Sequence, residues 1–358
     1  MSKEDFTVSV GTTRLWDAFE AGKDVARKAI SDLDEIPSFV LLFSTIHYEK
    51  HGGFEAFLNG VWEVLPPGTP LIGGTIAGFM NNDGCYTRGA TALAVSYQDM
   101  DVAIGIGHNT KRNPKKAVKK LSKSLKENIK NSEYSNNYIF QLTSGPTIPQ
   151  FPGVGRSFIL KGRISGSIAA KLIELSTKLL QKGIGREEEV LENTCRLFPN
   201  SSIISGSSTD DMTLSNCYQF INNNIYSNSV VALGISTDKA LNVNYKHGFS
   251  KLNNDVMKVS KMSFKGKIIK KINNNSAIKE FFKSINLSKE MFDERLHRKT
   301  FFFPLGFEYE DSTISPAAIG AVLGKAFSFS FRTDSRNLHV LSASGLSIVN
   351  AMQSCAND

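Results

Sequence analysis

The chain has 358 residues, of which 41% are hydrophobic, and a formal net charge of +8. This length exceeds the size at which a single hydrophobic core stops growing, so we expect two or more domains. No apolar run reaches the roughly 20 residues that cross a bilayer, and residues 1–10 lack the apolar segment of a signal peptide. These features argue against a membrane role and favour a cytoplasmic location.

The first part of the chain alternates helical and strand patterns. Apolar residues three or four positions apart predict amphipathic helices, and short apolar runs or alternating runs predict strands. We expect, in chain order, a helix over residues 14–31, a strand over 39–43, a helix over 54–65, a strand at Leu71-Ile72, and an antiparallel hairpin of 90–97 with 102–106.

The chain then repeats itself. Pro67–Gly78 reappears as Pro199–Asp210 without a gap, and each run contains a turn rich in glycine or serine. Two further segments match in the same order, Tyr86–Ser96 with Tyr226–Ser236 and Val102–His108 with Leu241–His247. This period is too long for a solenoid. It predicts two α/β half-domains, about 10–110 and 111–250, each with a mixed sheet flanked by helices, and a ligand between such halves is common.

The densest basic run, residues 111–130, carries an apolar stripe at helical spacing formed by Val118, Leu121, Leu125 and Ile129. Its lysines therefore lie on a solvated helix face. No basic motif interleaved with aromatic residues accompanies them, so we expect no nucleic-acid partner.

The remainder of the chain predicts a smaller α/β domain over residues 251–358. Residues 145–166 are rich in Pro and Gly and form either a surface excursion or a lid over a site. Further on we expect a strand over 267–272, a helix over 277–285, and strands over 300–306, 327–332 and 339–341.

Sequence motifs of catalysis are incomplete. Gly320–Lys325 resembles a P-loop but is one residue short and is followed by Ala326, so no hydroxyl follows the lysine. The sequence has no nucleophile elbow, and its four cysteines have no zinc-ligand spacing. Asp210-Asp211 is interpreted as a turn pair, with metal or base chemistry as the alternative. We therefore expect no enzymatic activity, no catalytic residue and no metal site.

One family resemblance rests on these glycine turns. Pro70–Gly78, preceded by the apolar run Phe39–Thr45, resembles the N-terminal part of the FIST family, named for F-box and intracellular signal transduction. Ser205–Asp211 is similar to the family's Gly-Gly-Ser-Ala-Gly-Asp-Asp stretch, from which Ser205, Ser208 and Thr209 depart. Phe303–Gly306 resembles the start of the family's C-terminal domain, which would be partial in this chain.

The resemblance implies a prokaryotic-type cytoplasmic sensor domain that binds a small ligand, catalyses nothing itself and acts through a separate output protein. Some bacterial members of the family bind haem and sense nitric oxide, so a second hypothesis is a haem-based gas sensor. His108 and His247, matched in the repeat, are then the candidate haem ligands, although we expect no cofactor. A third hypothesis is a hydrolase that uses Asp210, Asp211 or Cys217, and a fourth is an interaction scaffold.

Glycine turns give the ligand hypothesis its chemistry. Glycine lets the backbone approach a ligand closely, and successive amides can surround an anion. The predicted ligand-binding residues are Gly73, Gly74, Thr75, Gly78, Gly206, Ser207, Thr209 and Asp210. The alternative is that these glycines only allow strands to pack tightly.

Overall fold

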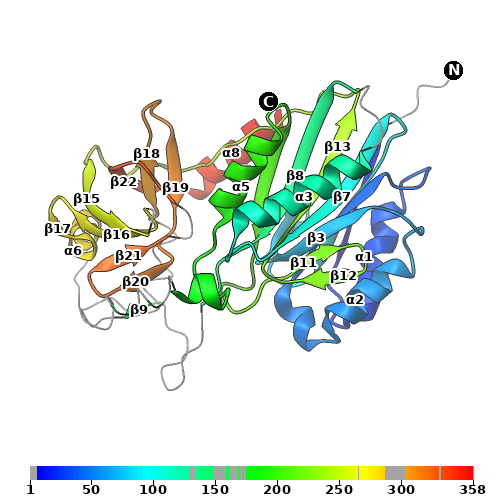
Figure 1. Cartoon of the computed structure of the whole chain (residues 1–358), viewed down its shortest axis with the longest axis horizontal. Coiled ribbons are helices and arrows are strands. Elements are labelled where there is room, and N and C mark those ends of the chain that lie inside the picture. The colour runs from blue at the N-terminus through cyan, green and yellow to red at the C-terminus, as the bar shows by residue number, and fades with distance from the viewer. Residues whose placement is uncertain are drawn as a thin grey trace. The chain divides into compact units, whose positions relative to one another are not determined.

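The computed structural model describes residues 6–129, 134–148, 159–160, 168, 172, 175–264, 266–286, 303–329 and 332–357 (Figure 1). The chain divides into two compact units, Met1–Ile148 with Gly185–Leu241 and Pro149–Ile184 with Asn242–Asp358. The second unit therefore includes residues 149–184, which lie within the predicted N-terminal domain of residues 1–250.

The first unit contains a six-stranded mixed sheet in the order β1-β6-β2-β3-β11-β12. Its central pair, β2 and β3, is parallel, and every other neighbouring pair is antiparallel. The strands are β1 (Thr7–Thr13), β2 (Phe39–Thr45), β3 (Leu71–Ile76), β6 (Ala90–Ser96), β11 (Gln219–Ile221) and β12 (Asn224–Tyr226). A separate hairpin joins β4 (Phe79–Asn81) and β5 (Gly84–Tyr86).

A second sheet of the same unit has the order β10-β8-β13-β7. Its strands are β7 (Met100–His108), β8 (Asn136–Ser144), β10 (Ser202–Ser208) and β13 (Ser229–Thr237). Here β8 and β10 are parallel while β13 runs antiparallel to both of its neighbours, which repeats the pattern β3-β2-β6-β1 of the first sheet. Leu71 on β3 pairs with Val40 on β2, and Ile203 on β10 pairs in the same way with Ile139 on β8. The predicted equivalence of β3 and β10 therefore holds.

The predicted hairpin of residues 90–97 with 102–106 is wrong. Strand β6 pairs with β1 and β2, whereas β7 pairs with β13 in the other sheet. Strand β7 thus opens the second half as β1 opens the first, and the boundary falls between Ser96 and Met100 rather than at residue 110. The match of Val102–His108 with Leu241–His247 also fails, because residues 241–247 form no strand.

Helices cover the outer face of each sheet. Helix α1 (Ala18–Ile30) and α2 (Gly53–Trp62), the latter preceded by the 3-10 helix η1 (Ile46–Lys50), pack on the first sheet. Helix α3 (Pro114–Asn128) and α5 (Glu187–Leu197) pack on the second (Figure 1). Because β1 extends to Thr13, α1 begins later than predicted, after Asp17, whose carboxylate accepts a hydrogen bond from the Glu20 amide.

The unit is therefore a four-layer sandwich of helices, sheet, sheet and helices. The inner faces of the two sheets meet in an apolar core that includes Phe39, Ile72, Leu142, Val231 and Leu233. Each outer face has its own core against its helices. Since both faces of both sheets are covered, the central strands are apolar almost throughout, as the run at residues 39–43 predicted.

The second unit is a smaller mixed α/β assembly. A twisted path of strands runs in the order β19-β18-β22-β15-β16-β21-β20-β9, with β14 beside β22 and β17 beside β16. Its elements are β9 (Ile159–Leu160), β14 (Ser250–Lys251), β15 (Met257–Ser263), β16 (Ile268–Ile272), β17 (Asn275–Ser276), α6 (Ala277–Ser284), β18 (Leu305–Glu308), β19 (Ile314–Ala317), β20 (Ala321–Leu323), β21 (Ala326–Ser328), β22 (Asn337–Ser342) and α8 (Gly345–Asn357).

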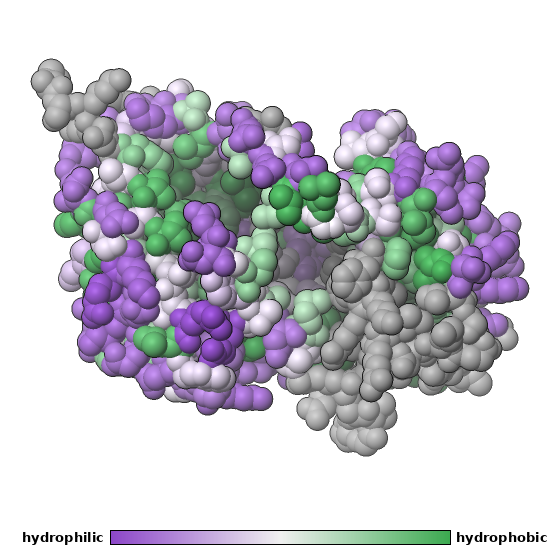
Figure 2. All heavy atoms as spheres, turned by 180° about the vertical axis from the view of Figure 1, so that it is seen from behind, coloured by the Kyte–Doolittle hydropathy of each residue, from purple (hydrophilic) through white to green (hydrophobic). Residues whose placement is uncertain are grey.

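Several C-terminal predictions hold within the described residues. Strand β16, helix α6 and strand β22 lie where the patterns placed them, and β21 and β18 occupy parts of the predicted strands at 327–332 and 300–306. Most of the 145–166 segment lies outside the described residues; its described strand β9 pairs with β20. None of the described helices has the length and apolarity needed to cross a bilayer. On the face drawn in Figure 2, hydrophilic and hydrophobic residues are interspersed.

Candidate functional site

Polar residues collect at the carboxyl ends of the parallel strands of both sheets. Strand β2 ends in Ser44-Thr45, β3 carries Thr75, β8 ends in Thr143-Ser144, and β10 ends in Ser207-Ser208. All of these except Ser207 are buried. Open α/β sheets bind ligands outside the carboxyl ends of their strands. This edge is therefore a candidate ligand-binding site.

One loop connects the two sheets at this edge. It spans residues 209–218, between β10 and β11, and is called the bridging loop below. The Thr209 amide donates a hydrogen bond to the Thr75 carbonyl (2.9 Å), and the Thr75 amide donates to the Tyr218 carbonyl (2.9 Å). The Tyr218 amide donates in turn to Thr75 Oγ1 (3.0 Å). Thr75 thus holds both ends of the loop.

Asp210 organises the interior of the bridging loop. Its side chain is buried, and its carboxylate accepts hydrogen bonds from the amides of Leu214 (2.8 Å) and Ser215 (2.6 Å) and from the Thr213 hydroxyl (2.7 Å). Such local bonds are typical of aspartate in turns. The turn interpretation of this residue is confirmed, and its carboxylate is already engaged by the loop.

Glu49, on η1, ties the other end of the bridging loop to the first sheet. Its Oε1 accepts hydrogen bonds from the Tyr218 hydroxyl (2.5 Å) and from Asn216 Nδ2 (3.0 Å). Burial, followed by the contact with Glu49, raises the pKa of Tyr218 well above its ordinary value. The phenol therefore stays protonated and donates to the carboxylate at neutral pH.

Beneath the loop lies a buried polar network. Gln219 Nε2 donates to Ser208 Oγ (2.5 Å), which donates to the Thr143 carbonyl (3.3 Å), and the Ser229 amide donates to Gln219 Oε1 (3.1 Å). Thr143 Oγ1 is buried and has no hydrogen-bond partner among the described residues. Buried polar atoms without partners are rare in folded proteins, so this hydroxyl is a candidate contact for a polar ligand.

The predicted site residues of the first half are packing residues. Gly73 and Gly74 lie within β3, and a Cβ at either would meet a backbone oxygen, Leu42 O at 1.7 Å or Tyr218 O at 2.5 Å. Thr75 is fully buried. Gly78 is exposed next to the β4–β5 hairpin, where a Cβ would meet Tyr86 O at 2.6 Å. The geometry of these glycines fits the alternative that they allow neighbouring backbone segments to pack tightly.

The second half presents its residues differently. Ser207 is exposed, Gly206 and Thr209 are half-buried, and a Cβ on Gly206 would find only ordinary contact, Leu142 at 3.5 Å. The difference follows from β11, which pairs with β3 and covers it, whereas β10 is the end strand of its sheet in the described part of the chain. Of the eight predicted residues, the structure links Thr75 to Thr209 and places Gly206, Ser207 and Asp210 next to that link.

A second polar cluster lies at the carboxyl ends of β1 and β2. The Arg88 guanidinium stacks on the Trp16 ring, 3.8 Å from its centroid, and the same ring contacts His51 (4.8 Å) and His47 (6.0 Å) edge-on. Thr45 Oγ1 lies 2.7 Å from His47 Nδ1. Trp16 and Arg88 come from segments distant in the sequence from His47 and His51, and no local pattern joins them to the two histidines.

His47 gives this cluster a pH dependence. Burial, aided by the charges of Arg88 and His51, lowers the pKa of His47 from 6.5 to about 4. The imidazole is neutral in the folded protein but protonates near pH 6.5 when unfolded. The contribution of His47 to the free energy of unfolding is therefore complete above pH 6.5 and is lost as the pH falls towards 4. Because the side chain is partly exposed, we expect this loss to be about 2 kcal/mol.

Between pH 7 and pH 4.5 the free energy of unfolding should fall in both proteins. We expect the fall in His47→Gln to be smaller than that in the wild type by about 2 kcal/mol. Urea unfolding at the two pH values measures this difference. His108→Gln, which keeps His47, should show the full wild-type loss. An identical loss in the His47→Gln and wild-type proteins would contradict the assignment.

Each of the two histidines proposed as haem ligands has a hydrogen-bond partner in the structure. His108 Nδ1 lies 3.1 Å from Ser229 Oγ, and His247 Nε2 lies 2.9 Å from the Ile314 carbonyl. The pocket beside His108, about 300 Å³, is lined by polar and basic side chains, namely Asn109, Arg112, Asn113, Lys116 and Lys120. Haem requires an apolar cavity and a free imidazole nitrogen, and neither histidine offers both.

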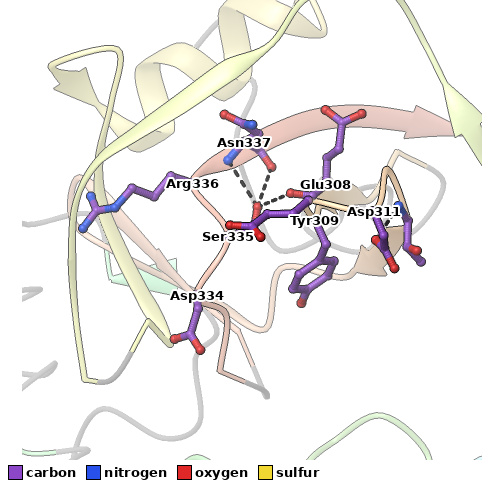
Figure 3. A pocket seen from close by; sticks show the side chains of 9 residues that line it. Glu308, Tyr309, Asp311, Asp334, Ser335, Arg336 and Asn337 are labelled. Carbon is purple, nitrogen blue, oxygen red and sulfur yellow. Dashed lines mark hydrogen bonds between the residues drawn. The ribbon is translucent and has the colours of Figure 1, made fainter.

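The second unit has an acidic pocket of about 670 Å³, lined by the end of β18 with the residues that follow it and by the segment that leads into β22 (Figure 3). Hydrogen bonds from Lys251 and His339 lower the pKa of Glu308 on its wall, and those from Thr313 lower the pKa of Asp311. These carboxylates are therefore already bound within the protein. No group of three or more potential metal ligands occurs among the described residues.

Cys217, a candidate nucleophile, is a buried residue of the bridging loop. Its Sγ lies 3.3 Å from Ser144 Oγ and 3.8 Å from the Gly145 carbonyl oxygen. Neither group is a general base, one of the means by which a thiol nucleophile is activated. Asp210, the candidate base, is engaged by the loop amides.

Comparison with known proteins identifies one family. A family model described as the FIST N domain matches residues 38–275. The solved structure of a cyanuric acid hydrolase from A. caulinodans is similar to this chain at 9% sequence identity, covering 65% of this chain and 72% of that chain, with a TM-score of 0.31. A similarity of this size carries no argument about activity. No match was found among the curated proteins.

Proposed function

Because this chain belongs to the FIST N domain family, a sensor-type family of signal transduction, we propose that it is a cytoplasmic sensory domain that binds a small ligand and catalyses no reaction. The ligand contacts the exposed edge of β10 at Gly206, Ser207 and Thr209, beside the bridging loop. The observation that carries this proposal is the contrast between β3, which β11 covers, and β10, which has no second partner strand among the described residues. The two strands have the same place in their sheets.

The chemistry of this edge supports a small polar ligand. An edge strand has unpaired backbone donors and acceptors, and Ser207 adds an exposed hydroxyl. Ser207 is the register partner of Thr143, whose hydroxyl is buried without a partner among the described residues. A ligand with several polar atoms would supply the partners that this edge lacks.

The bridging loop supplies a route for the signal. Thr209 lies next to the proposed contact and donates to Thr75, and Thr75 also holds Tyr218. A ligand that moves Thr209 would therefore shift the hydrogen bonds that join the two sheets. In this proposal the change is read by a separate output protein, and no cofactor takes part.

The hydrolase alternative has less support. It requires a nucleophile and a base within hydrogen-bond reach of one another, and Cys217 and Asp210 have the other partners described above. We therefore propose that the domain responds to its ligand by binding alone.

A thermal-shift screen with amino acids, nucleotides and other small anions tests the proposal. A compound at about 100 times its dissociation constant adds about 2.7 kcal/mol to stability, which raises the melting temperature by several degrees. Ser207→Val should abolish the shift while changing the stability of the free protein by less than about 0.5 kcal/mol.

The matched control is Ser202→Val, an exposed serine at the opposite end of the same strand, which should keep the full shift. A shift that persists in Ser207→Val would place the ligand elsewhere and contradict the proposed site.

A further inference from the structure

We propose that Arg88, His47 and Trp16 form a binding site for a small oxyanion at the carboxyl ends of β1 and β2, separate from the β10 edge. These residues come from three segments of the chain that converge around the Trp16 ring. The inference does not rest on the sensory function proposed above, because it uses none of the residues on β10.

Two buried nitrogens of this cluster have no hydrogen-bond partner among the described residues, Arg88 Nη1 and His47 Nε2. A buried polar atom without a partner is exceptional and often marks the binding position of a water or an ion. Two such atoms around one aromatic ring indicate a ligand with at least two polar atoms.

The positive charge of Arg88 indicates that the ligand is negatively charged. None of the described ion pairs includes Arg88. Of the carboxylates on the neighbouring elements, Asp24 pairs with Lys28 at 2.7 Å and Glu49 accepts from Tyr218 and Asn216. Arg88 therefore has no carboxylate within ion-pair distance among the described residues. A guanidinium is suited to bind two oxygens of one group.

Thr45 joins the segment of His47 to the segment of Arg88. Thr45 Oγ1 contacts His47 Nδ1 (2.7 Å) and also bonds both polar backbone atoms of Gly89, the residue after Arg88. The Thr45 hydroxyl has one proton, which it can donate either to the Gly89 carbonyl oxygen (3.2 Å) or to Nδ1. In the state in which it donates to Nδ1, the shorter contact, Nε2 carries the imidazole proton and is a donor. Arg88 Nη1 and His47 Nε2 then present two donors to one oxyanion.

Trp16 acts as the cover of this site. Its side chain is 56% exposed, whereas the two nitrogens beside it are buried. An oxyanion reaches them once the indole rotates away from the guanidinium, and exposed side chains rotate readily. Binding therefore changes the environment of an indole ring, which makes it visible by fluorescence.

The experiment follows Trp16 fluorescence in a Trp62→Phe background, which removes the other tryptophan. Sodium acetate and sodium phosphate are titrated separately at constant ionic strength against sodium chloride, so the two arms distinguish a carboxylate from a phosphoryl group. We expect a saturable change with one of them and none with chloride. Saturation should also raise the pKa of His47, followed by NMR.

Arg88→Gln should weaken this binding at least about tenfold, the equivalent of 1.4 kcal/mol. Arg14→Gln is the matched control, because Arg14 is an exposed arginine that stacks 5.1 Å above the ring of Tyr86 instead. Ser207→Val should also bind normally, so failure of this site is distinguishable from failure of the β10 site. Absence of a saturable signal with both oxyanions, or unchanged binding by Arg88→Gln, would overturn the proposal.

Discussion

Gly22→Ala and Gly60→Ala should each lower the free energy of unfolding by about 3 kcal/mol or more. The two glycines face each other's helix where α1 crosses α2. A Cβ on Gly22 would lie 2.0 Å from the Phe57 carbonyl oxygen, and one on Gly60 would lie 2.1 Å from that of Phe19. Alanine favours a helix by about 1 kcal/mol over glycine, but separating two packed backbones costs more, so destabilisation wins.

Gly206→Ala is the control for this prediction, because its Cβ would meet only the Leu142 side chain at 3.5 Å. Urea unfolding should show a large loss of unfolding free energy in Gly22→Ala and Gly60→Ala, and a loss below about 0.5 kcal/mol in Gly206→Ala. Equal, small losses in all three would mean that α1 and α2 are farther apart than described here.

Asp210→Ala should cost about 3 kcal/mol of unfolding free energy. The substitution removes a buried acceptor from three loop amides, that of Asn216 at 3.4 Å, and from the Thr213 hydroxyl. A hydrogen bond to a charged group contributes about 1.5–3 kcal/mol, and such contributions do not add within one network. Because the loop ends are held separately by Thr75, the loss should be accompanied by faster hydrogen exchange at Leu214 and Ser215.

Asp211→Ala is the matched control for this second prediction. Asp211 is the exposed neighbour of Asp210, so its replacement should change stability by less than about 0.5 kcal/mol. If both aspartates proved equally dispensable, the bridging loop would not depend on the buried carboxylate.

Local patterns predicted the strands and helices whose neighbours are close in the sequence. The apolar run at Phe39–Phe43 became β2 because both of its faces are covered, and the stripe through Val118, Leu121 and Leu125 became the buried face of α3. The equivalence of β3 and β10 was also visible, since two similar sequences take the same place in two sheets.

Pairing between distant strands was not predictable in the same way. Strands β6 and β7 have a short connection typical of a hairpin, yet each finds a partner from another part of the chain. Strand β11 adds to the sheet of the other half through β3, which buries Thr75 but leaves its counterpart Ser207 exposed. Repetition in the sequence implied one ligand between two similar halves, whereas this one strand covers the end of β3 and leaves that of β10 exposed.

The cluster of Trp16, His47 and Arg88 shows a second limit of sequence patterns. Its residues come from separate segments and are joined by stacking and by charge, neither of which has a characteristic spacing in sequence. The partial C-terminal FIST domain stays a prediction, because the matching family model ends at residue 275.

Amide hydrogen exchange with and without a ligand from the screen tests the sensory account most directly. Ligand at the β10 edge should slow exchange at Thr209 and Tyr218, whose amides join the bridging loop to Thr75, and should leave the acidic pocket of the second unit unchanged. Slower exchange confined to the walls of that pocket, at residues 308–313 and 334–337, with an unaffected bridging loop, would contradict the account.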